Sequence, residues 1–276
     1  MILGKAISPF ALRKISGGGG GGGTDPDAQA FITATGISGT NATATNQLVL
    51  DLKSANIWSK MKAVYPMVGG TATTHKFNLI NPQDTNAAFR LVFSGGGTHS
   101  SNGYLPNGVN SYADTFLAPT TSLTNNNTHI SFYSRTNSAG LYFDMGSGQA
   151  GGQYLDLALN ISGNIYADQY NNSTGRITTA NANTQGFYIS SRTLSNVFKL
   201  FKNSAQIGTT NTGASTGFAS LTSNLYLSAL RQGGSNLYFS NRECAFASIG
   251  DGLSDAEALA FYNAVQLFNT TLARQV

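Results

Sequence analysis

The chain has 276 residues, of which 41% are hydrophobic, enough to bury the core of one large domain or two small ones. Charged residues make up only 10% and the formal net charge is +4, without long runs of lysine or arginine. Nucleic-acid binding, which needs a basic stripe interleaved with aromatic side chains, is therefore not predicted. We find no bilayer-spanning apolar run and no export signal, so a membrane partner is not predicted either.

The chain begins with a short apolar and basic segment, residues 1–16, followed by a polyglycine tether over residues 17–24. A glycine run has no side chains to pack, so it separates the segment from the rest of the chain. We predict that the segment anchors the protein on a partner; a terminus without function is the alternative. The predicted anchoring residues are Ile2, Leu3, Lys5, Ile7, Phe10, Leu12, Arg13 and Lys14.

Residues 25–73 are predicted to form a helical collar between the tether and the main domain. Asp25 and Pro26 are a helix-start signal. In the segment that follows, Leu48, Leu52 and Ala55 recur at the helical period, and this helix is expected to continue through the apolar residues 57–61.

From Lys76 onward, short runs rich in valine, isoleucine, threonine and aromatic residues alternate with glycine, asparagine and serine clusters. This pattern predicts an antiparallel β-sandwich of two stacked sheets over residues 74–276. Ser254 and Glu257 have the spacing of a capping box, so a C-terminal helix is predicted over residues 254–272. The predicted strands are residues 89–94, 112–117, 129–135, 141–145, 154–161, 165–169, 186–192, 196–202, 205–210, 224–231 and 244–250.

Three segments of this region resemble the laminin-G-like family. Residues 197–203 and 205–208 resemble its hairpin with a basic-Asn turn, and residues 224–230 resemble its next strand, with Ser228 where glycine is more usual. Residues 246–250 and the helix after them are similar to its last strand and helix. The resemblance implies a concanavalin-A-like, laminin-G-like jelly roll, mostly β, with a short N-terminal helical segment and a C-terminal helix.

A second resemblance is to a group of bacteriophage virion proteins, carried by residues 57–66, 75–79, 89–93 and 272–276. It implies a structural or adhesive part of a phage particle: a head fibre, a capsid decoration or a tail fibre. The implied location is the virion, the implied partners are other virion proteins held through residues 1–16, and a homo-oligomer is expected. The fold alone does not fix the function.

Metal and cofactor chemistry is not predicted. The three histidines, His75, His99 and His129, are far apart and lack metal-ligand spacing. The single cysteine, Cys244, excludes an intramolecular disulfide and is expected to lie buried in a strand. Residues 251–255 resemble a calcium loop only superficially, since helix capping explains them, although calcium bound by loop carbonyls stays open.

Enzymatic activity is also not predicted, and no catalytic residue is assigned. Glycosidases need two carboxylates facing each other in a cleft. The Glu-x-Asp-x-x-Glu strand of the glucanases with this fold is absent. Asp144, Asp156 and Asp168 are candidates, but solvent-facing strand positions explain them equally well. A glycoside hydrolase is therefore the third hypothesis.

Glycan binding is the alternative to a structural role in a particle. Lectin sites combine an aromatic face with amides and backbone groups, all of which are plentiful in this chain. The predicted ligand-binding residues, expected in or near loops, are Tyr104, Asn110, Tyr112, Tyr166 and Tyr170.

Overall fold

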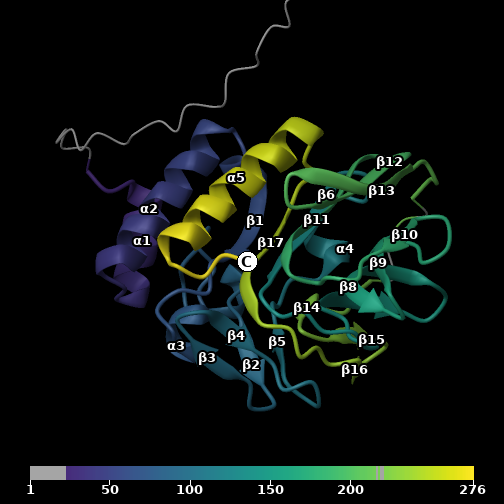
Figure 1. Cartoon of the computed structure of the whole chain (residues 1–276), viewed down its shortest axis with the longest axis horizontal. Helices are drawn as coiled ribbons and strands as arrows, with labels where there is room; N and C mark the ends of the chain where they lie inside the picture. Colours follow the sequence, from purple (N-terminus) through teal and green to yellow (C-terminus); the bar gives the residue numbers. More distant parts are fainter. Residues whose placement is uncertain (1–22, 216, 218–220) are drawn as a thin grey trace, which may run out of the picture.

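The computed structural model describes residues 23–215, 217 and 221–276. The predicted anchoring residues therefore lie outside the described residues, and so does the tether up to position 22. The described chain forms two stacked, almost entirely antiparallel sheets with three longer helices on the outer face of one of them (Figure 1). The predicted β-sandwich with a helical segment before it and a helix after it is confirmed.

Sheet A, the sheet beside the helices, has the strand order β13-β12-β11-β6-β17-β4-β3, and β1 also pairs with β17. Its central strand β6 is buried along its whole length, because one face meets sheet B and the other meets the helices. The strands are β1 (Met61–Tyr65), β3 (Thr98–Ser100), β4 (Gly103–Leu105), β6 (Thr128–Ser134), β11 (Gly186–Leu194), β12 (Val197–Lys202), β13 (Ala205–Asn211) and β17 (Cys244–Gly250).

Sheet B has the order β10-β9-β8-β7-β14-β5-β2, and the hairpin β15-β16 joins it through β7. The chain reverses direction at Ser228, which has a φ of 65° and so adopts the left-handed conformation that favours glycine. The strands are β2 (Val92–Ser94), β5 (Tyr112–Asp114), β7 (Met145–Gln149), β8 (Gln153–Ile161), β9 (Asn164–Gln169), β10 (Arg176–Ala180), β14 (Tyr226–Leu227), β15 (Leu230–Gln232) and β16 (Ser235–Leu237).

The helices α1, α2 and α5 lie side by side against sheet A (Figure 1). The predicted capping box of α5 is confirmed, since the Ser254 hydroxyl accepts from the Glu257 N–H and the Glu257 carboxylate accepts from the Ser254 N–H. No described helix is both long and apolar enough to cross a bilayer. The helices are α1 (Pro26–Thr35), α2 (Gly39–Ser54), η1 (Trp58–Lys60), α3 (Ala72–His75), η2 (Asn86–Ala88), α4 (Pro119–Ser122) and α5 (Asp255–Thr271).

The described chain has two apolar cores, one on each face of sheet A. Ile130 and Phe132 of β6 point into the core between the sheets, whereas Tyr133 points into the core beneath the helices. Leu48 of α2 and Phe261 of α5 share this second core. The helices are therefore packed onto the sandwich as part of one body.

The predicted helical collar is wrong at its C-terminal end. Helix α2 stops at Ser54, and residues 61–65 form β1, which pairs with β17. Four of the five β1 residues are buried, so its sequence reads as a near-continuous apolar run without alternation, and such runs are easily read as helix.

The C-terminal tail is fixed by Arg274, which is 1% exposed. Its guanidinium donates to the carbonyls of Pro66, Met67 and Ala245 at 2.6, 2.6 and 2.9 Å. Two of the strings that resemble phage virion proteins, residues 57–66 and 272–276, thus meet at this contact. They belong to the framework of the fold.

Candidate functional site

The outer face of sheet B carries a row of polar side chains across the neighbouring strands β8, β9 and β10. Leu155 and Leu157 of β8 point into the core, so Asp156 between them points outward. In the register of the sheet, Gly146, Asp156, Asp168 and Arg176 lie directly opposite one another on β7, β8, β9 and β10. Two carboxylates and a guanidinium are therefore neighbours on one face.

Asp168 and Arg176 form a two-pronged ion pair. Arg176 donates from Nε to Oδ1 at 2.7 Å and from a terminal nitrogen to Oδ2 at 2.6 Å. Asp168 is fully buried and the Arg176 side chain is 32% exposed. Burial raises the pKa of Asp168, and the hydrogen bonds from Arg176 oppose that shift. The pair fixes the guanidinium at the edge of the sheet.

Asp156 lies beside this pair with neither carboxylate oxygen hydrogen bonded among the described residues. Leu230 helps to cover this face: a Cβ added at Gly146 would lie 2.8 Å from Leu230 Cδ1. Burial first, and then the charge of Asp168, raise the pKa of Asp156 well above its usual value. Asp168, in contrast, is the carboxylate that faces Arg176, and the hydrogen bonds from that guanidinium oppose the effect of burial on its pKa.

A groove lies where β10, the edge of sheet B, meets β13, the edge of sheet A. Its volume is about 330 Å³. We call it the edge groove. It is lined by Arg176, Ile177, Thr178, Thr209, Thr210, Asn211, Thr212 and Gly213.

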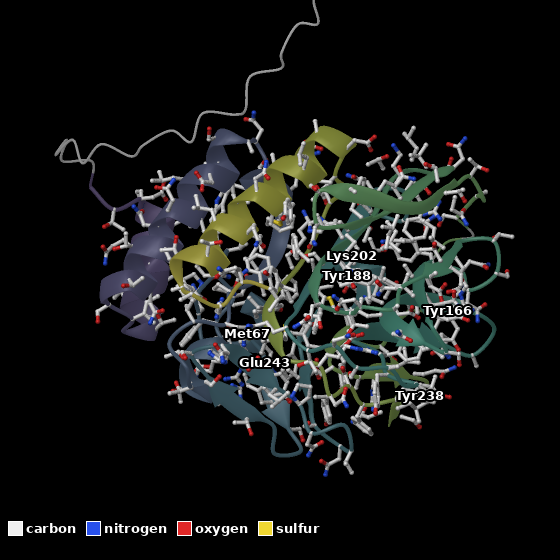
Figure 2. The ribbon with its side chains drawn as sticks, viewed as in Figure 1. Met67, Tyr166, Tyr188, Lys202, Tyr238 and Glu243 are labelled. Carbon is white, nitrogen blue, oxygen red and sulfur yellow. The ribbon has the colours of Figure 1, made fainter. Side chains whose placement is uncertain are left out.

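Tyr166, labelled in Figure 2, lies on β9, the strand that pairs with β10 at the edge groove. Tyr166 is directly opposite Thr178 in the strand register. Its ring is half-buried, and the Arg176 guanidinium lies over it, with a distance of 5.2 Å between Arg176 Cζ and the ring centroid. The ion pair with Asp168 holds Arg176 in this position. The Tyr166 ring is therefore adjacent to Arg176, which lines the groove.

The opposite wall of the edge groove is held by Asn211. Its side-chain amide donates to the Arg176 carbonyl at 2.8 Å and its Oδ1 accepts from the Gly213 N–H at 2.8 Å. Thr178, Thr209 and Thr212 are exposed. An aromatic ring beside hydroxyl, amide and guanidinium groups can bind a polyhydroxylated ligand through ring stacking and hydrogen bonds.

The five predicted ligand-binding residues do not meet in one site. Tyr166 flanks the edge groove. Tyr112 stacks on Tyr226 at 4.8 Å on the far side of sheet B, on β5. Asn110 lies in an exposed loop, where its Oδ1 accepts from the side chain of Asn107 at 2.9 Å.

The prediction that Tyr104 and Tyr170 bind a ligand is wrong, because both side chains are fully buried, although Tyr170 does lie in the bend that follows β9. Tyr104 lies on β4 against Phe93 and His99, and Gly97 provides the space: a Cβ there would lie 2.4 Å from the ring. Tyr170 has a φ of 71° and points into the core, where its hydroxyl hydrogen bonds to Thr128. Neither ring can contact a ligand at the surface.

The alternative interpretation of the three candidate acids, that they are solvent-facing strand residues, is wrong. Asp144, Asp156 and Asp168 are all buried. Asp144 pairs with the equally buried Arg242 at 2.8 Å. Glycosidase carboxylates face each other across space for a substrate, whereas Asp156 and Asp168 are neighbours beneath other side chains.

Two histidines that are 24 residues apart in the sequence meet in the structure: His75 Nδ1 and His99 Nδ1 are 2.9 Å apart. Their distance along the chain gave no sign of this contact. Within residues 23–215, 217 and 221–276, no three side chains of the metal-ligating types converge on one point.

The groove residues on β10 and β13 were not predicted from the sequence. The β-branched run at positions 177–179 was a usable strand signal, because isoleucine and threonine favour strands. Nothing in the sequence indicated that this strand would meet residues 209–213, since the two strands belong to different sheets.

No protein-family model matches the chain, and no curated protein matches it. Among solved structures, it is similar to a mutant of Trypanosoma rangeli sialidase that displays trans-sialidase activity, with 11% identity, a TM-score of 0.54, and coverage of 82% of this chain and 39% of that one.

Two further similarities have TM-scores below 0.5. A NanB sialidase mutant from Streptococcus pneumoniae has 15% identity and a TM-score of 0.44, covering 60% of this chain and 27% of that one. The CBM40 module of the Ruminococcus gnavus IT-sialidase, bound to α2,3 sialyllactose, has 20% identity and a TM-score of 0.38, covering 49% and 80%. The chain thus spans well under half of either sialidase, and at these identities the likeness shows the fold alone.

Proposed function

We propose that this chain is a carbohydrate-binding module that holds a glycan in the edge groove. The observation that carries the proposal is a groove lined by Arg176 and mainly by threonine and asparagine side chains, with the Tyr166 ring on the neighbouring strand in contact with the Arg176 guanidinium. A sugar ring presents C–H groups to an aromatic face and hydroxyls to polar side chains, so it matches both parts of this surface.

The proposed module binds without cleaving its ligand. Support comes from the burial of Asp144, Asp156 and Asp168, none of which lines the edge groove. Incubating the protein with the glycan that it binds and measuring reducing ends checks this point. Release of reducing sugar would show catalysis instead.

Replacing Tyr166 by alanine is expected to weaken glycan binding by about tenfold or more, because the stacking face is lost. Replacing it by phenylalanine keeps the ring and is expected to keep most of the affinity. A glycan array first identifies the ligand, and isothermal titration calorimetry then compares the variants.

The matched control is Tyr112→Ala, which removes a ring from the same sheet at the far strand β5. It is expected to leave binding unchanged. Loss of binding in Tyr112→Ala with normal binding in Tyr166→Ala would place the glycan site near β5 instead of at the edge groove, and would overturn the proposal.

A second proposal, display of this module on a phage particle, is supported by the resemblance of residues 57–66 and 272–276 to virion proteins. Deleting residues 2–16 is then expected to abolish incorporation into particles and to leave glycan binding intact. Immunoblots of purified particles check the first expectation, and normal incorporation of the shortened chain would exclude the predicted anchoring role.

A further inference from the structure

A second hollow, formed by residues other than those of the edge groove, lies between α3 and the residues that lead into β2. Its volume is about 350 Å³, and its lining residues are Ala72, Thr73, Lys76, Arg90, Leu91, Val92 and Phe93. We call it the basic hollow. The Leu91 N–H donates to the Lys76 carbonyl at 2.7 Å, which holds the two sides together.

The charged side chains that line the basic hollow are both cations. Lys76 Nζ lies 2.5 Å from one oxygen of Asp84, and a terminal nitrogen of Arg90 lies 2.7 Å from the other. Asp84 is 47% exposed in its side chain and does not line the hollow. Two positive charges therefore share one carboxylate, and the group of three carries a net charge of +1.

Asp84 is the anion that Lys76 and Arg90 hold. Hydrogen bonds from Lys76 and Arg90 lower its pKa, so it is ionised at neutral pH. Arg90 is oriented by a second bond, from Nε to the Asn86 side chain at 3.0 Å. The two cations thus already hold one carboxylate, that of Asp84, from two sides.

The remaining lining of the hollow is largely apolar. Val92 is 38% exposed, and the Phe93 ring is held by an edge contact to His99 at 4.4 Å and by Tyr104 at 4.8 Å. Burial lowers the pKa of His99, so this ring stays uncharged at neutral pH and adds no cation behind Phe93. A ligand that fills the hollow should therefore combine an anionic group with an apolar body.

We propose that the basic hollow binds a carboxylate carried on a compact apolar body, with Lys76 and Arg90 holding the carboxylate and Phe93 contacting the body. The bound carboxylate competes with Asp84 for the same cations. This site is independent of the edge groove and does not rest on the proposed glycan function.

The test measures the affinity of the whole chain for phenylacetate and for its uncharged analogue phenylacetamide by calorimetry or ligand-observed NMR. Phenylacetate is expected to bind and phenylacetamide is not. Arg90→Gln is expected to weaken phenylacetate binding about tenfold, because one charge-assisted contact is lost. Equal binding of the two probes, or unchanged binding by Arg90→Gln, would overturn the proposal.

Asp84→Asn gives the sharper outcome, since it removes the internal competitor and is expected to tighten phenylacetate binding. The matched control is Asp255→Asn, which removes one exposed carboxylate from Lys199 on β12 and changes the net charge equally. The same tightening in both variants would mean that net charge alone attracts the probe. Tyr166→Ala should leave phenylacetate binding unchanged, which separates this site from the edge groove.

A free acid and the carboxyl terminus of a peptide share this chemistry. N-acetyl-alanyl-phenylalanine and its C-terminal amide distinguish the two sources. Tighter binding of the peptide acid than of phenylacetate assigns the hollow to a peptide terminus, whereas weaker binding assigns it to a small acid. Binding of the peptide amide as tight as that of the acid would contradict the role of the two cations.

Discussion

Replacing Asp144 by alanine is expected to destabilise the protein by about 3 to 5 kcal/mol, because the change leaves a buried guanidinium without its counter-charge. Asp144 and Arg242 are both fully buried and lie 2.8 Å apart. Asp144 also accepts from the Ser240 hydroxyl at 2.7 Å and from the Leu159 N–H at 3.0 Å. The measurement is urea unfolding followed by circular dichroism.

The double variant Asp144→Leu with Arg242→Met is the matched control. It removes both charges and fills the same volume with apolar side chains, so it is expected to be clearly more stable than Asp144→Ala. Arg242 also donates to the Ser138 carbonyl at 2.8 Å and to the Asn160 carbonyl at 3.2 Å, so part of the loss remains. A cost below about 1 kcal/mol for Asp144→Ala would place the ion pair in contact with solvent.

Acidification is expected to destabilise the protein through two buried histidines. Burial, then the neighbouring His99 and Arg274, lower the pKa of His75 to about 3. Burial lowers the pKa of His129 to about 4, although its hydrogen bond to the Asp251 carbonyl opposes the shift. Below a pH of about 6.5 these two histidines become protonated in the unfolded chain but stay uncharged in the folded chain. The free energy of unfolding therefore falls as the pH falls.

The expected size of this effect is about 2 kcal/mol from each histidine between pH 7 and pH 5. Asp156 acts in the opposite direction, because its raised pKa lets the folded chain hold a proton that the unfolded chain releases. The test is therefore a difference: the stability gap between the wild type and His129→Gln should narrow by about 2 kcal/mol from pH 7 to pH 5.

Asp156 is present in both proteins of this comparison, so its contribution cancels. The carboxylates with lowered pKa values, such as Asp84 and Glu257, titrate below this range and leave the comparison undisturbed. A stability gap that stays constant between pH 7 and pH 5 would mean that His129 is not held uncharged in the folded protein.

Several elements could be predicted because short-range chemistry decides them. The capping box of α5 needs only Ser254 and Glu257, three residues apart, and the structure contains both of its hydrogen bonds. The hairpin of β12 and β13 turns at Asn203, whose φ of 54° suits asparagine. Cys244 is buried in a strand, as its apolar neighbours indicated.

The inward or outward direction of single side chains was harder to predict. Tyr166, Asp168 and Tyr170 are two residues apart and would share one face of a regular strand. The left-handed backbone at Tyr170 breaks that alternation and turns its ring into the core. Tyr166 and Tyr170 therefore point to opposite faces of sheet B. A local conformation of this kind depends on the hydrogen bond to Thr128, which is 42 residues away.

The sequence by itself determined the class of the protein: a two-sheet sandwich with helices before and after it, stabilised by apolar burial. Only the tertiary structure decided where ligands can bind. The edge groove exists because β10 and β13, from different sheets, meet at one margin of the sandwich, and the basic hollow exists because Asp84, Lys76 and Arg90 converge. Local spacing along the chain encodes helices and turns, whereas these sites depend on strand order and register, which long-range packing sets.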